Sequence, residues 1–130
     1  MFATPFEKGC MLVLGGARSG KSGFALNVCN GLGRRRIFLA TAQAGDDEMA
    51  ARIRNHRAER GSEWRTIEAP LGIADRIRAA DGPESVILLD CLTLWLSNLF
   101  MAHGEDQAEV EGQVTALCDV LSSLKGTYLV

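Results

Sequence analysis

Apolar-rich runs of five or six residues recur along the chain, and each is followed by a segment that suits a helix. Runs of this length without strict alternation are typical of strands buried in a parallel sheet. The predicted strands are residues 10–14, 36–40, 64–69, 85–90 and a last one that starts at 127. The predicted helices are residues 21–30, 46–60, 70–80, 92–102 and 105–125. Strands alternating with helices predict an α/β fold with a mostly parallel sheet covered by helices.

Residues typical of helix ends support these boundaries. Asp46, Asp47 and Glu48 place negative charge at the start of the helix 46–60, where the helix dipole favours it. Pro70 suits the first turn of the helix 70–80. In the helix 105–125, one stripe of apolar residues predicts the buried face. The stripe consists of Val110, Val114, Leu117, Leu121 and Leu124.

Residues 1–130 suit a single domain with an ordinary hydrophobic core. Hydrophobic residues make up 47% and charged residues 23% of the chain, which excludes disordered and low-complexity classes. The last predicted strand holds only residues 127–130, whereas a strand usually has about 5–6 residues. We therefore expect the chain to be cut within its fold, with a C-terminal part missing.

The charges are unevenly distributed. Residues 1–78 carry a net charge of +5 and residues 79–130 a net charge of −7. The basic half suits a small polyanion such as a nucleotide, but it is too dilute and too poor in aromatic residues for a nucleic-acid surface. The longest apolar stretch, residues 86–102, contains Asp90 and is shorter than a membrane span of about 20 residues.

The four cysteines show no CxxC pair and no zinc spacing. We expect Cys10, Cys29, Cys91 and Cys118 to be small buried hydrophobic residues in a reducing compartment. With no membrane span and no signal peptide in the sequence, this predicts a cytoplasmic protein.

A phosphate-binding motif joins the first predicted strand to the first predicted helix. The motif is Gly15-Gly16-Ala17-Arg18-Ser19-Gly20-Lys21-Ser22, which matches GxxxxGK[ST]. In such a P-loop, backbone N–H groups surround phosphate oxygens and the helix N-terminus adds positive charge. Lys21 is expected to reach the β- and γ-phosphates, and Ser22 to hold Mg²⁺. The P-loop predicts a nucleotide-binding domain.

Two further residues have alternative interpretations. Asp90 ends the strand 85–90, where a carboxylate suits Mg²⁺ support, and it could also cap the helix that starts at Leu92. His56 lies among arginines on the helix 46–60. From the pattern alone it is more often a half-buried structural histidine, and the alternative is a nucleophile that attacks a nucleotide phosphorus.

Three segments resemble the bifunctional adenosylcobinamide kinase/adenosylcobinamide-phosphate guanylyltransferase family of cobalamin biosynthesis. They are GGARSGKS, ATAQAGDDEMAARIRNHRAERGSEWRTIEAP and ILLDCLTLWLSNL, and the similarity runs from about residue 11 to residue 130. The resemblance implies a P-loop fold and two activities. One phosphorylates adenosylcobinamide with ATP or GTP. The other transfers GMP from GTP through an enzyme histidine to adenosylcobinamide phosphate, giving adenosylcobinamide-GDP.

The resemblance also implies roles for individual residues. The RIxxH pattern makes His56 the nucleophile, and Lys21 joins it in the catalytic set. Nucleotide contacts beyond the P-loop carry over to Ala40, Thr41, Ala42, Arg57, Ala58, Glu59, Arg60, Glu68 and Asp90. Family members continue past the last strand and assemble as homo-oligomers, with a trimer implied.

Two alternatives to the bifunctional transferase remain. A P-loop kinase or ATPase would need no nucleophilic histidine, so replacing His56 would spare its turnover. A nucleotide-binding module, inactive because the chain is short, would bind nucleotide without forming a covalent adduct. No NKxD motif for reading guanine is present, which disfavours a regulatory GTPase.

Overall fold

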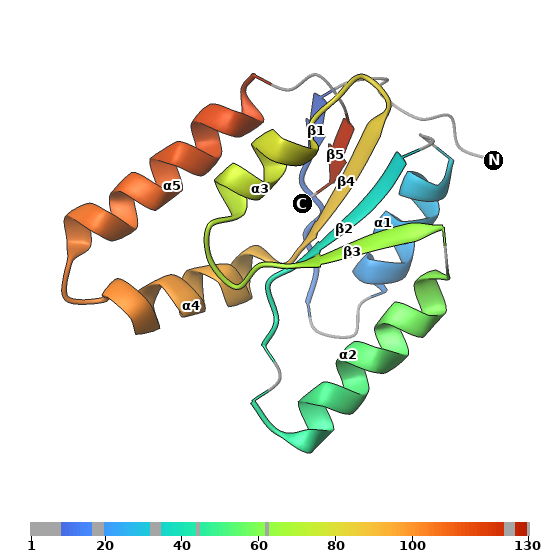
Figure 1. Cartoon of the computed structure of the whole chain (residues 1–130), viewed down its shortest axis with the longest axis horizontal. Coiled ribbons are helices and arrows are strands. Elements are labelled where there is room, and N and C mark those ends of the chain that lie inside the picture. Colours follow the sequence, from blue (N-terminus) through green and yellow to red (C-terminus); the bar gives the residue numbers. More distant parts are fainter. Residues whose placement is uncertain are drawn as a thin grey trace.

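Strands and helices alternate along the chain, and two helices follow the fourth strand in succession, as the hydrophobic pattern predicts (Figure 1). The structure is a computed structural model that describes residues 9–16, 20–31, 35–43, 45–61, 63–123 and 127–129. The strands are β1 (Gly9–Met11), β2 (Arg35–Ala40), β3 (Trp64–Glu68), β4 (Ser85–Asp90) and β5 (Thr127–Leu129). The helices are α1 (Lys21–Asn30), α2 (Asp47–Arg60), α3 (Ile73–Ala80), α4 (Leu92–His103) and α5 (Gln107–Leu121).

The five strands form one parallel sheet in the order β1-β5-β4-β2-β3. The longest pairings join β2 to β3 on one side and to β4 on the other. β5 lies between β1 and β4, so the strand before the P-loop does not pair with the strand that ends in Asp90. The predicted α/β class with a parallel sheet is confirmed.

Helices cover both faces of the sheet, and alternate residues of the central strands face them. The residues that pack with α3, α4 and α5 are Ile37, Leu39, Ile87 and Leu89. The residues that pack with α1 are Phe38, Val86 and Leu88. Figure 1 shows α2 standing apart from α3, α4 and α5. Because β2 and β4 are buried on both faces, their sequences are continuous apolar runs rather than alternating ones.

The predicted stripe of α5 faces this core. Val110 and Leu117 are buried, and Val114 and Leu121 are half-buried. Leu117, Val114 and Leu121 belong to the cluster beneath α3 and α4. The fifth member of the stripe, Leu124, lies outside the described residues.

Several predicted boundaries were wrong, among them the end of the last helix, which lies at Leu121 rather than at residue 125. The first strand ends at Met11 rather than at residue 14, and Leu14 is 81% exposed. α3 begins at Ile73 instead of Pro70, because Gly72 adopts φ 66° in the left-handed region, which a helix cannot contain. α5 begins at Gln107 because the Asp106 carboxylate accepts a hydrogen bond from the Glu109 N–H at 3.1 Å and so caps the helix.

α4 follows β4 directly, as the apolar stretch 86–102 predicts. Trp95 and Leu99 are buried on one side of α4. Its other side exposes four large apolar residues, Leu94, Leu96, Phe100 and Met101. Within the described residues, no helix has both the length and the apolar content needed to cross a membrane.

The cysteines differ more than the sequence predicts. Cys29 is buried, Cys91 is half-buried, and Cys10 and Cys118 are exposed, so the expectation of four buried thiols was wrong. Cys29 lies on the face of α1 that packs against β2 and β4. This burial raises the pKa of the Cys29 thiol to about 12, although the positive charge of Arg36 acts in the opposite direction.

We expect Cys29 to resist alkylation in the native protein because the thiolate is the reactive form. At pH 8, iodoacetamide should modify Cys29 at least about 100-fold more slowly than the exposed Cys118. Peptide mass spectrometry over a time course measures both rates. In urea the two rates should converge; equal rates without urea would show that α1 does not bury this thiol against the sheet.

Candidate nucleotide-binding site

The described part of the P-loop leads directly into α1. Gly15, Gly16, Gly20, Lys21 and Ser22 are described, whereas Ala17, Arg18 and Ser19 lie outside the described residues. Gly20 has φ 86° and precedes the helix, which starts at Lys21 as predicted. A side chain at this φ would be strained, which explains the glycine in the motif. The Lys21 ammonium donates a hydrogen bond to the Gly16 carbonyl oxygen at 3.2 Å.

The carboxyl ends of three strands lie in one row beside this loop. Ala40 of β2 is paired in register with Glu68 of β3 and with Asp90 of β4. Ligands of open α/β sheets bind at this edge. The parallel register therefore brings three predicted contact positions from distant parts of the sequence to one edge of the sheet.

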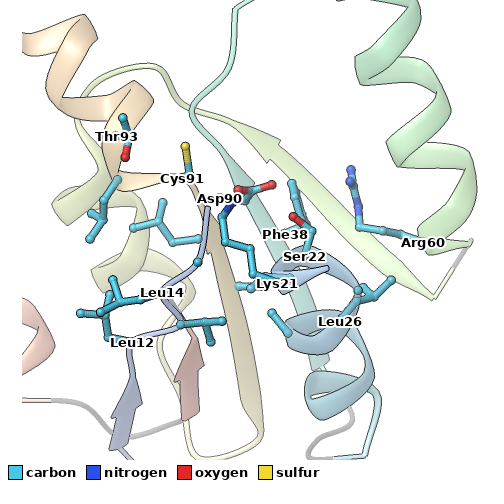
Figure 2. Close-up of a pocket in the computed structure, with 17 residues that line it drawn as sticks. Leu12, Leu14, Lys21, Ser22, Leu26, Phe38, Arg60, Asp90, Cys91 and Thr93 are labelled. Atoms are coloured by element: carbon cyan, nitrogen blue, oxygen red, sulfur yellow. The ribbon is translucent and has the colours of Figure 1, made fainter. Parts of the chain in front are cut away.

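A cavity of about 350 Å³ separates the start of α1 from the end of β4. This volume falls in the usual range of roughly 300–1,000 Å³ for small-molecule sites. Its charged residues are Lys21, Arg60 and Asp90, and the Ser22 hydroxyl lies between them (Figure 2). Apolar residues form much of the remaining wall, among them Leu12, Leu26 and Leu88. Two cations and a hydroxyl in one cavity suit a phosphorylated ligand.

Thr41 ties the ends of β2 and β4 together. Its side chain is fully buried, and its hydroxyl accepts a hydrogen bond from the Cys91 N–H at 2.9 Å. The same hydroxyl lies 2.9 Å from the Cys91 carbonyl oxygen, to which it donates, and the Thr41 N–H donates to the Asp90 carbonyl oxygen at 3.1 Å. The Asn98 amide of α4 donates to the carbonyl oxygens of Thr41 and Pro70 at 2.9 and 3.0 Å. These bonds hold the backbone that carries Asp90.

Arg60, the last residue of α2, reaches from this helix into the cavity wall. Its guanidinium lies 3.5 Å from the centroid of the Phe38 ring and donates a hydrogen bond to the Thr66 hydroxyl at 3.1 Å. Burial lowers the pKa of this guanidinium, the neighbouring Arg57 lowers it further, and Asp90 opposes the change. A partly desolvated positive charge of this kind would be stabilised by a bound anion.

His56 lies one helical turn before Arg60 on α2. Its side chain and that of Glu59 fall outside what the structure describes. Positions four apart lie on the same side of a helix, so the backbone places residue 56 on the side of α2 that carries Arg60.

The predicted contacts divide into two sets. Gly15, Lys21, Ser22, Arg60 and Asp90 line the cavity. The other described positions do not line it; they are Gly16, Gly20, Ala40, Thr41, Ala42, Arg57, Ala58 and Glu68. Of these, Thr41 is occupied in bonds within the protein, and its contact with a nucleotide stays a prediction.

The residues present fit a magnesium ion that is held mainly by phosphates. Among the described residues, no group of three His, Cys, Asp or Glu side chains could hold a metal. The Ser22 hydroxyl and the Asp90 carboxylate line the same cavity, and Mg²⁺ is usually bound by one or two such protein oxygens together with phosphates and water. The cap of α4 is Cys91 and has no side-chain cap bond, so the alternative role of Asp90 as the helix cap was wrong.

Sequence reasoning did not single out Asn98, Phe38 or Thr66 as residues of the site. Phe38 has the pattern of an ordinary core residue, and Asn98 lies in an apolar helix where its amide is unusual. Asn98 was the only one of the three with a local signal in the sequence, because a polar side chain within an apolar helix needs hydrogen-bond partners.

Replacing Thr41 tests the bonds between β2 and β4. Thr41→Val keeps the shape but removes the hydroxyl, which should lower the free energy of unfolding by about 1–3 kcal/mol. Thr41→Ser keeps the hydroxyl and loses one methyl group, so its cost should stay near about 1 kcal/mol. Urea denaturation followed by circular dichroism measures both values. If valine were tolerated better than serine, the hydroxyl would not be holding the Asp90–Cys91 segment.

Comparison with known proteins agrees with the site. The sequence model of the cobinamide kinase / cobinamide phosphate guanyltransferase family matches residues 11–130. A bifunctional adenosylcobalamin biosynthesis protein, CobP, of Pseudomonas aeruginosa is 44% identical over 118 residues, which are 91% of this chain and 67% of the relative.

Two enterobacterial relatives are both named bifunctional adenosylcobalamin biosynthesis protein CobU. The Escherichia coli protein is 41% identical over 107 residues, covering 82% of this chain and 59% of its own length. The Salmonella typhimurium protein is 44% identical over 94 residues, covering 72% and 51%. This chain thus spans between about half and two thirds of the length of these relatives. With the family match along nearly its whole length, the chain belongs to the cobinamide kinase / cobinamide phosphate guanyltransferase family.

Proposed function

We propose that this chain is a nucleotide-dependent transferase of cobalamin biosynthesis with two activities. It phosphorylates adenosylcobinamide with ATP or GTP, and it transfers GMP from GTP through His56 to adenosylcobinamide phosphate. The family membership and the names of the relatives support this assignment.

One observation carries the proposal. The cavity gathers Lys21 and Ser22 from the P-loop, Asp90 from β4, and Arg60 from the helix on which His56 lies. A P-loop alone occurs in many kinds of nucleotide-binding protein. A cavity that also receives the end of α2 connects the phosphate groups to the element that bears the proposed nucleophile.

In the guanylyl transfer, an imidazole nitrogen of His56 forms a bond to the α-phosphorus of GTP. The bond from that phosphorus to the bridging oxygen breaks, and pyrophosphate leaves. Lys21 and Arg60 stabilise the negative charge that develops on the phosphate oxygens. A phosphate oxygen of adenosylcobinamide phosphate then attacks the same phosphorus, which breaks the P–N bond and gives adenosylcobinamide-GDP.

In the kinase reaction, the hydroxyl of the aminopropanol arm of adenosylcobinamide attacks the γ-phosphorus of ATP or GTP. The bond from that phosphorus to the β,γ-bridging oxygen breaks, ADP or GDP leaves, and the hydroxyl loses its proton to water. This transfer needs the P-loop and Lys21 but no histidine. Ser22 and Asp90 would hold Mg²⁺. When bound, this ion would neutralise part of the negative charge of the triphosphate. Both reactions therefore use the P-loop and Lys21 to bind the phosphates, and they differ in the group that attacks the phosphorus.

We also propose that the protein works in the cytoplasm as a homo-oligomer, with the trimer of the family as the expected state. The exposed apolar side of α4, which includes Phe100 and Met101, supports assembly because it leaves apolar area that a second copy could cover. Light scattering coupled to size-exclusion chromatography determines the number of copies.

The covalent step is tested by intact-mass analysis after incubation with GTP and Mg²⁺. The wild type should gain the mass of one GMP, and acid should remove it because a phosphoramidate is acid-labile. His56→Ala should abolish this gain, since it removes the nucleophile. His103→Ala is the matched control, because His103 is the other histidine of the chain and lies at the end of α4.

Each alternative has its own result in this experiment. GTP binding and phosphorylation of adenosylcobinamide without an adduct would favour a kinase without the second activity. Binding with neither reaction would favour a nucleotide-binding module. An adduct that persists in His56→Ala would contradict the role of this histidine.

Replacing Asp90 tests the proposed magnesium support. Asp90→Asn should raise the Mg²⁺ concentration for half-maximal adduct formation by about 10- to 100-fold, because it removes a carboxylate that holds or orients the ion. Asp75→Asn on the outer side of α3 is a matched control with the same change of charge. Removing the metal with EDTA should stop adduct formation in all variants; an unchanged magnesium dependence in Asp90→Asn would contradict this role.

A further inference from the structure

We infer that Phe38 is a positioning residue that holds the Arg60 guanidinium at the phosphate cavity. The inference rests on the proposed function, because it takes the phosphates of GTP as the anion that Arg60 meets. The inference assigns Phe38 an indirect role in nucleotide binding, which it exerts through Arg60. Neither the position of Phe38 in β2 nor its apolar character would suggest this role.

The seat of Arg60 consists of two side chains on paired strands. Phe38 of β2 and Thr66 of β3 are direct partners in the parallel register, so their side chains lie next to each other on one face of the sheet. The Phe38 ring lies under the guanidinium at 3.5 Å, and the Thr66 hydroxyl accepts its hydrogen bond at 3.1 Å. Phe38 and Arg60 both line the cavity (Figure 2). The guanidinium is therefore held by contacts with two side chains on neighbouring strands.

The Phe38 ring is itself fixed. Trp64 packs edge-on against it, with ring centroids 6.4 Å apart and an interplanar angle of 79°. The Trp64 indole N–H donates to the side-chain oxygen of Asn30, at the end of α1, at 3.0 Å. Phe38 and Trp64 are both buried in the cluster beneath α1. The aromatic surface under Arg60 therefore belongs to the rigid core rather than to a mobile surface group.

α2 by itself cannot fix the side chain of Arg60. In its described part, α2 has no fully buried side chain, and Arg60 is its last residue. The other side-chain bond that the structure describes on α2, between Arg52 and Glu48, lies within the helix. The contacts with Phe38 and Thr66 are thus the described side-chain contacts that link this end of α2 to the sheet.

The seat leaves donors of Arg60 for a ligand. The Arg60 Nε is buried, so a ligand in the cavity would meet the terminal nitrogens of the guanidinium rather than this atom. The guanidinium has five N–H donors, of which the described bond to Thr66 uses one. Phosphate oxygens are the acceptors that match this planar group best. A guanidinium that is held against a ring before the ligand arrives loses less conformational freedom when it binds.

The experiment compares GTP affinity among variants of the full chain by isothermal titration calorimetry. Phe38→Leu keeps the apolar bulk but removes the aromatic face, and it should weaken GTP binding about 5- to 30-fold. Phe38→Tyr keeps the ring and should bind GTP like the wild type. If Phe38→Leu does not fold, Phe38→Met is the replacement with the same purpose. Thermal unfolding of every variant is measured in parallel.

A double-mutant cycle separates positioning from general packing. In an Arg60→Ala background, Phe38→Leu should cause no further loss of GTP affinity, because its effect runs through the guanidinium. Val86→Ala, in the same core cluster but outside the cavity, should lower the unfolding temperature and leave GTP affinity unchanged.

Two results would overturn the inference. One is unchanged GTP affinity in Phe38→Leu. The other is an equal loss of GTP affinity on Phe38→Leu in the wild type and in Arg60→Ala, which would show that Phe38 only lines the cavity. A wild type that binds GTP but forms no GMP adduct would contradict only the proposed transfer, since the cycle measures binding. A wild type that binds no GTP would contradict both.

Discussion

Parallel pairing of β2 with both β3 and β4 is the constraint on which the site depends. It sets Ala40, Glu68 and Asp90 in one row, and it sets Phe38 beside Thr66 two residues earlier. A shift of one residue in either pairing would turn the side chains of a strand to the opposite face. The same register therefore determines the position of Asp90 relative to the P-loop and the position of the two side chains, Phe38 and Thr66, that contact Arg60.

The polar groups near the site have two different tasks. Thr41 and Asn98 use their hydrogen bonds within the protein. Thr41 joins the ends of β2 and β4, and Asn98 joins α4 to the end of β2 and to the turn before α3. Lys21, Arg60 and Asp90 line open space instead. Buried groups with satisfied bonds make the edge of the sheet rigid, and charged groups at the cavity remain available to a ligand. Rigid support of this kind lets charges be placed before the ligand arrives.

The sequence was sufficient where one short segment determines its own structure. α1 starts at Lys21 because Gly20 of the P-loop motif immediately precedes it with a positive φ, and β4 was predicted with its observed bounds because its apolar run is continuous. It was not sufficient where distant segments decide. Pro70 is as suitable for a turn as for a helix start, and here its carbonyl accepts a bond from Asn98 of α4. The contact between Phe38 and Arg60 joins β2 to the end of α2, which no local periodicity can reveal.

The place of β5 in the sheet has a consequence for how the protein forms during synthesis. β1 precedes the P-loop, but in the described sheet it pairs only with β5, whose residues are made more than a hundred positions later. Pairings between such distant segments are slow to form, because a long loop must close first. On the ribosome, β2, β3 and β4 can pair before β5, the partner of β1, has been synthesised. The cavity beside the P-loop is therefore completed late, and a nascent chain that stops before β5 lacks the strand that joins β1 to the sheet.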